Sequence, residues 1–209
     1  MKLKRSRLGE FVPVMDKNKT LYGGYQNMLK DMGVSKFYRD RACVVTAFTN
    51  TYLYLFRPFE KFDFNEFNDY QYWFFKILKP KVYGIPTARV LDFKLNRIRK
   101  SYHLNLKSHI LEDTFLRRKS MDEIIDFISQ ALNKDLPVIF FNLLSKNIDL
   151  MSHHGVTITE LKEKEDDYIL TISSWARVYK ISLKEFLKQN RTYTGFIYFD
   201  RDNIKKSTL

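Results

Sequence analysis

The strongest constraint on the fold is a change in hydrophobic period just after residue 135. Before this point the apolar residues recur every three or four positions, which is the spacing of helices that bury one face. After Pro137 an uninterrupted apolar segment, 138–144, is followed by segments in which apolar and polar residues alternate, the pattern of strands. Helices followed by strands are typical of an α+β fold. We therefore expect a helical N-terminal half packed on an antiparallel β-sheet from the C-terminal half.

Capping and breaking residues predict where the elements begin and end. Ser120 and Glu123 have the spacing of a capping box, so a helix should run from Met121 to Asn133. Prolines end two earlier helical patterns, because proline cannot continue a helix. The other expected helices are 25–32, 40–56, 65–78, 87–102 and a brief one at 182–188. The expected strands are 138–144, 155–161, 168–174, 176–181 and 195–199.

The segment 40–56 is the expected centre of the fold and carries the only cysteine, Cys43. Its apolar residues lie at helical spacing, which predicts a largely buried helix. Asp40 is a candidate N-cap, which would place Cys43 in the first turn, where free backbone N–H groups and the helix dipole favour a thiolate. The alternative is that Cys43 is a small buried apolar residue without chemistry. A nucleophilic role requires a base elsewhere in the chain.

Composition limits the class of protein and its partners. The 209 residues, 44% hydrophobic and 29% charged, suit one globular domain over 1–209, with residues 1–20 as an N-terminal arm. One cysteine makes neither an intramolecular disulfide nor a cysteine-based zinc site, so we expect a cytoplasmic protein without metal or cofactor. No apolar run is long enough to span a bilayer. The net charge of +12 comes from scattered Lys and Arg residues, which favours a solvated surface over a nucleic-acid site.

Two adjacent histidines, His153 and His154, stand where the expected strand 155–161 begins. The expected strand that follows ends in Ser173 and Ser174, and Trp175 comes next. Neighbouring antiparallel strands bring such ends together. We therefore expect His154 to lie on the sheet, close to this polar pair and facing an edge or a cleft.

Three short blocks of the chain, 42–47, 154–158 and 173–176, resemble the papain-like cysteine peptidases. Within that superfamily they are most similar to small bacterial proteins related to the double-glycine leader peptidases. The blocks correspond to the helix that carries the nucleophile, the strand that begins with the histidine, and an Asn-Ser-Trp-Gly segment. The resemblance implies a papain-like fold with a central helix that bears the cysteine. It also implies a cysteine hydrolase, most simply a peptidase acting on peptide or protein substrates.

The resemblance further implies roles for single residues. Cys43 would be the nucleophile and His154 the base, and an acyl group would be transferred through a thioester. Ser173 would stand in the place of the Asn or Asp that orients the imidazole. Gln26, together with backbone N–H groups at the helix start, would form the oxyanion site. His153 is the alternative base if the register shifts by one residue.

Some positions depart from the family pattern and leave other functions open. Val44 stands where Gly commonly follows the nucleophile, Gly155 where an aromatic residue follows the histidine, and Ala176 in place of Gly. One alternative is a catalytically lapsed relative that binds peptide in the same cleft. Another is a nucleic-acid binder that uses the basic helical segment 89–100. Thiol reactivity tests the first alternative, and salt-dependent oligonucleotide binding tests the second.

Overall fold

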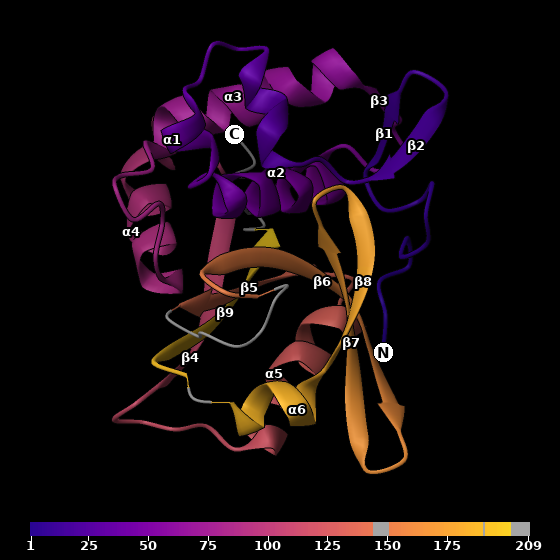
Figure 1. Cartoon of the computed structure of the whole chain (residues 1–209), viewed down its shortest axis with the longest axis vertical. Helices are drawn as coiled ribbons and strands as arrows, with labels where there is room; N and C mark the ends of the chain where they lie inside the picture. Colours follow the sequence, from indigo (N-terminus) through magenta and orange to yellow (C-terminus); the bar gives the residue numbers. More distant parts are fainter. Residues whose placement is uncertain (144–150, 190, 202–209) are drawn as a thin grey trace, which may run out of the picture.

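A helical layer packs on one face of a six-stranded sheet in the computed structural model, which describes residues 1–143, 151–189 and 191–201 (Figure 1). The central helix of this layer, α2 (Cys43–Phe56), lies against the sheet. The remaining elements of the layer are η1 (Gln26–Lys30), α1 (Lys36–Arg39), α3 (Phe64–Leu78) and α4 (Ala88–Ile98). The expected α+β class, with helices in the N-terminal half and an antiparallel sheet, is therefore confirmed.

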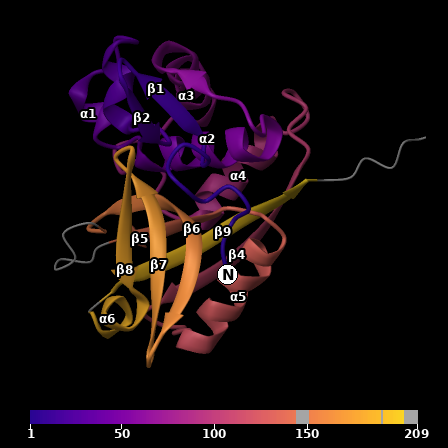
Figure 2. The same ribbon diagram turned by 90° about the vertical axis from the view of Figure 1, so that its right-hand side faces the viewer.

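The sheet has the strand order β4-β9-β5-β6-β7-β8, with every neighbouring pair antiparallel. Two further helices, α5 (Met121–Asn133) and α6 (Leu183–Lys188), lie on the face opposite α2 (Figure 2). This double covering explains the continuous apolar run of β5, which is a central strand. The strands are β4 (Leu106–Thr114), β5 (Val138–Leu143), β6 (His154–Lys164), β7 (Asp167–Ser174), β8 (Arg177–Ser182) and β9 (Tyr193–Arg201).

Capping residues gave the most accurate helix boundaries. The helix predicted from Met121 to Asn133 has these bounds, and Ser120 and Glu123 form the expected capping box. The helix expected at 65–78 begins one residue earlier, with Asp63 as its N-cap. The helix expected to reach residue 102 ends at Ile98. The last residue of the strand expected at 138–144 lies outside the described residues.

The arm 1–20, expected to be irregular or strand-like, includes part of a small sheet of order β2-β1-β3, formed by β1 (Pro13–Asp16), β2 (Lys19–Tyr22) and β3 (Phe62–Asp63). Strand β4 was not predicted, because its side chains are mostly half-buried and its sequence shows no clear alternation of apolar and polar residues.

The core beneath the site is filled by aromatic rings. Phe48 of α2 contacts Phe74 of α3 at a centroid distance of 4.9 Å and Phe199 of β9 at 5.5 Å, both edge to face. All three rings are fully buried. These contacts tie the central helix both to its helical neighbour and to the sheet, which fixes where the first turn of α2 meets β6.

Candidate active site

Cys43 is the first residue of α2, and its side chain is half-buried. The N-cap is Ala42 and not Asp40, so this part of the prediction was wrong. Asp40 instead ends the short helix α1, where its carboxylate pairs with Lys36 Nζ at 2.6 Å. Burial raises the pKa of the Cys43 thiol, while the backbone N–H groups of Gly155, Val44 and Cys43 act in the opposite direction. The resting side chain is therefore a thiol surrounded by donors that would stabilise a thiolate.

Strand β6 begins directly over the first turn of α2. A Cβ atom added at Gly155 would lie 2.5 Å from Val44 Cγ2, closer than real side chains approach. Only glycine fits at this position without displacing helix or strand. The resemblance to papain-like peptidases leads one to expect Gly at position 44 and an aromatic residue at position 155. Val44 is larger and Gly155 is smaller than expected, so the two departures compensate each other in size.

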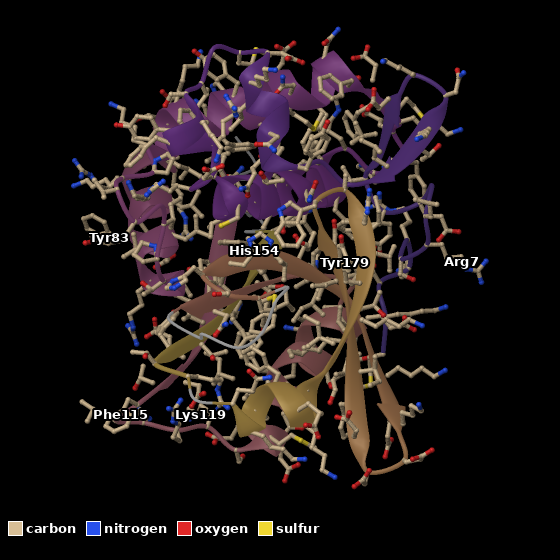
Figure 3. All side chains as sticks on the ribbon, viewed as in Figure 1. Arg7, Tyr83, Phe115, Lys119, His154 and Tyr179 are labelled. Atoms are coloured by element: carbon tan, nitrogen blue, oxygen red, sulfur yellow. The ribbon has the colours of Figure 1, made fainter. Side chains whose placement is uncertain are left out.

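His154, labelled in Figure 3, is held from two sides by residues at the end of β7. Its Nε2 lies 2.8 Å from Ser174 Oγ, and its ring stacks on Trp175 with a centroid distance of 4.6 Å and an interplanar angle of 16°. Burial lowers the pKa of His154 to about 4, so the imidazole is neutral at physiological pH. In the tautomer whose Nε2–H donates to Ser174 Oγ, Nδ1 is the ring nitrogen that can accept a proton.

Ser174, and not Ser173, is the serine that contacts the imidazole. Ser173 Oγ donates to the backbone oxygen of Tyr22 at 2.7 Å and is buried. Successive side chains of a strand point to opposite faces, so only one of the two serines can reach His154. The assignment of Ser173 as the orienting residue is corrected accordingly, although the strand and the polar pair were correctly anticipated.

Trp175 and Ala176 form the tight turn between β7 and β8, and both have positive φ, 46° and 60°. This conformation normally favours Asn or Gly. Hydrogen bonds to Tyr22 hold the turn from both ends: Tyr22 N–H donates to Ala176 O at 3.0 Å, and Tyr22 O accepts from Ser173. The anchored turn keeps the Trp175 ring over His154.

Two cavities share Cys43 and His154 as lining residues. The larger has a volume of about 620 Å³ and is walled mainly by apolar residues of the segment before α4 and by Phe141 of β5. The smaller, about 20 Å³, is also lined by Gln26, Ser174 and Trp175. The nucleophile and base candidates therefore face common space, and Gln26, the candidate oxyanion residue, lines the smaller cavity with them.

Helix α3 fixes the wall that carries Gln26. Gln71 is fully buried and donates from Nε2 to Thr46 Oγ1 at 2.6 Å and to Tyr25 O at 3.3 Å. One amide thus connects the first turns of α2 with the residue before Gln26. The link positions the side chain of Gln26 relative to Cys43 through backbone rather than through a flexible loop.

No family model, curated protein or solved structure matches this chain. The three short blocks therefore carry the resemblance to papain-like peptidases without support from a detectable relative. A catalytic role for Cys43 and His154 is therefore proposed from the geometry around them.

Two residues that line the larger cavity carry no signal in the sequence that would have selected them. Asn142 is opposite His154 in the β5–β6 pairing; its Nδ2 donates to Met151 O at 2.7 Å, and Oδ1 lacks a partner within the described part of the chain. Tyr83 is 84% exposed at the rim. His153, the alternative base, also lines this cavity and has a φ of 51°. The β5–β6 pairing brings Asn142 to this cavity, whereas Tyr83 reaches it from the segment between α3 and α4.

The basic helix α4 is partly neutralised within the molecule. Arg89 pairs with Glu112, and Arg99 contacts Asp92 at 3.3 Å. Lys94 Nζ donates to Leu78 O at 2.6 Å. These contacts leave few of its cations available for a polyanion, so the helix adds no support for the nucleic-acid alternative.

The described residues contain no group of three or more His, Cys, Asp or Glu side chains that could hold a metal ion. They also contain no helix with the length and apolar character needed to cross a bilayer.

Proposed function

We propose that this protein is a papain-like cysteine hydrolase, most simply a peptidase, with Cys43 as nucleophile and His154 as base. The observation that carries the proposal is that Cys43 begins α2 and lines the same cavity as His154, whose Nε2 is held by Ser174. A thiol, a base and a third group that orients the base are the three parts that nucleophilic catalysis requires.

The proposed reaction starts from a neutral thiol and a neutral imidazole, because burial raises the pKa of Cys43 and lowers that of His154. His154 Nδ1 accepts the thiol proton while Sγ attacks the carbonyl carbon. The negative charge on the carbonyl oxygen is stabilised by the N–H groups of Cys43 and Val44 and by the Gln26 amide. This differs from a preformed thiolate–imidazolium pair, which the exclusion of water from both groups disfavours.

The second half of the reaction reverses the proton transfer. The imidazolium gives its proton to the leaving amine as the C–N bond breaks, which leaves a thioester on Cys43 and a neutral His154. Water then attacks the thioester carbonyl while His154 accepts a proton from it. The C–S bond breaks, the proton returns to sulfur, and a carboxylic acid is released.

The larger cavity supports an apolar group on one side of the scissile carbonyl. Its walls include Val82, Ile85, Pro86 and Phe141. An apolar side chain of a substrate would bury its surface here at about 25 cal/mol per Å². Peptides with large apolar residues near the cleaved bond are therefore the first substrates to test.

The test compares two alkylating reagents. Iodoacetamide measures the accessibility of the thiol, whereas a peptidyl epoxide with an apolar side chain also requires an activated thiol and an open cleft. We expect the epoxide to label Cys43 and the labelling to fall by about 100-fold or more in His154→Ala, since a general base contributes roughly that much. His109→Ala is the matched control, because His109 is a half-buried histidine paired with Asp200 on the sheet edge, away from both cavities.

The same labelling separates the alternatives. Loss of labelling in His153→Ala, with His154→Ala unaffected, would assign the base to His153. A Cys43 that reacts with iodoacetamide but not with the epoxide, at a rate independent of both histidines, would indicate a peptide-binding module without hydrolase activity.

A further inference from the structure

A tight turn after β4 presents two large apolar side chains to solvent. Phe115 is 74% exposed and Leu116 is 94% exposed. The turn lies at the lower left edge of the molecule, where Phe115 projects outward, far below the segment that contains Tyr83 (Figure 3). Neither residue lines a cavity shared with Cys43 or His154. The proposed hydrolase activity therefore does not account for them.

The turn is held firmly, so the exposure is not the result of a loose segment. Thr114 and Arg117 exchange both backbone hydrogen bonds, each 3.1 Å long, which places Phe115 and Leu116 at the two corner positions. Phe115 N–H also donates to Thr192 O at 3.2 Å. Corner positions normally hold Gly, Asn, Asp or Ser. Nothing in the backbone of this turn requires apolar residues.

Cations follow the apolar tip immediately. Arg117, Arg118 and Lys119 are consecutive, and no described carboxylate lies within ion-pair distance of Arg117. Behind the tip, a groove of about 480 Å³ is lined by further cations from the α6 region, Lys184, Lys188 and Arg191. Arg118 and Arg191 share a single carboxylate, that of Asp113. Lys119, Lys184 and Lys188 each pair with one carboxylate, that of Glu123, Asp166 and Glu185 respectively. The excess positive charge around the turn therefore comes from Arg117 and from the two arginines that share Asp113, on a chain whose net charge is +12.

We propose that this turn, residues 114–119, anchors the protein to the surface of an anionic lipid bilayer. Phe115 and Leu116 enter the boundary between headgroups and acyl chains, and the adjacent Arg and Lys side chains contact lipid phosphates. The combination selects this partner: a nucleic acid offers no place for Leu116, and an acidic peptide bound in the groove would leave the apolar tip in water. Interfacial attachment needs no membrane-spanning helix.

The experiment is co-sedimentation of the full chain with vesicles. One set contains phosphatidylcholine alone, and the other contains equal amounts of phosphatidylcholine and phosphatidylserine. We expect binding to the anionic vesicles, weakening as salt is raised, and little binding to the neutral ones. The double variant Phe115→Ser/Leu116→Ser should lose about tenfold or more in partitioning, and Arg117→Gln about fivefold.

Phe59→Ser is the matched control, because Phe59 is an equally exposed ring, 85%, in the turn that follows α2. It should bind like the unmodified chain. Circular dichroism of each variant confirms that it is folded. The proposal is overturned if the chain does not bind anionic vesicles, or if the double serine variant binds as tightly as the unmodified chain, which would reduce the interaction to charge alone. Binding of an oligonucleotide or acidic peptide that the double variant abolishes, without vesicle binding, would also overturn it.

Discussion

The Cβ atom that Gly155 lacks would lie 2.5 Å from Cγ2 of Val44. This contact joins the strand that carries His154 to the helix that carries Cys43, and it leaves no room for a side chain. The close approach of this strand to this helix therefore requires glycine at position 155.

Substitution Gly155→Ala should destabilise the fold by about 1–3 kcal/mol, because the added methyl group overpacks a rigid contact between helix and strand. Urea unfolding measures this change. In a Val44→Ala background the same substitution should cost clearly less, since the clashing methyl group is absent. Equal costs in both backgrounds would show that the two residues are not in contact.

The buried imidazole should make stability depend on pH. The pKa of His154 is lowered to about 4 in the folded chain, so between pH 6.5 and 4 the unfolded chain binds more protons than the folded one. The free energy of unfolding should therefore decrease as the pH is lowered through this window, by about 2 kcal/mol from pH 7 to pH 5. Unfolding at both pH values, compared with His154→Gln, isolates this contribution. The same pH dependence in the variant would mean that His154 titrates normally.

The two adjacent serines should give opposite phenotypes. Ser174→Ala removes the group 2.8 Å from His154 Nε2 and should slow labelling of Cys43 by a peptidyl epoxide by about 10- to 100-fold, with little loss of stability. Ser173→Ala removes the hydrogen bond to Tyr22 O and should lower the free energy of unfolding by about 1 kcal/mol while labelling is retained. If the phenotypes are exchanged, Ser173 is the orienting residue after all.

Trp175 shields His154 from water, and its removal should restore an ordinary imidazole. In Trp175→Ala the pKa of His154 should rise from about 4 toward 6.5, because desolvation is the cause of the shift. The measurement is an NMR titration of the imidazole proton. Val178→Ala, an exposed position on the same hairpin, is the control and should leave the pKa unchanged. An unchanged pKa in Trp175→Ala would assign the shielding to other residues.

Local signals in the sequence determined the fold class and several boundaries. The capping box at Ser120 and Glu123 fixes the start of α5, because the bonds that make it are between neighbours in the chain. The apolar run of β5 likewise indicates a strand covered on both faces. The same kind of reasoning located Cys43 at a helix start and His154 at a strand start. It missed β4, whose mostly half-buried side chains show no clear alternation of apolar and polar residues.

Other features depend on which residues meet across the fold. The choice of Ser174 over Ser173 follows from the direction of side chains at the end of β7, and the apolar cavity from the way β5 and the segment before α4 close around Cys43. The depressed pKa of His154 comes from its burial in the folded chain, and the turn held by Tyr22 stacks Trp175 on the imidazole. Sequence therefore determined which chemical groups are present and on which elements they lie. Tertiary structure alone decided their partners and protonation, because burial and contact depend on residues far apart in the chain.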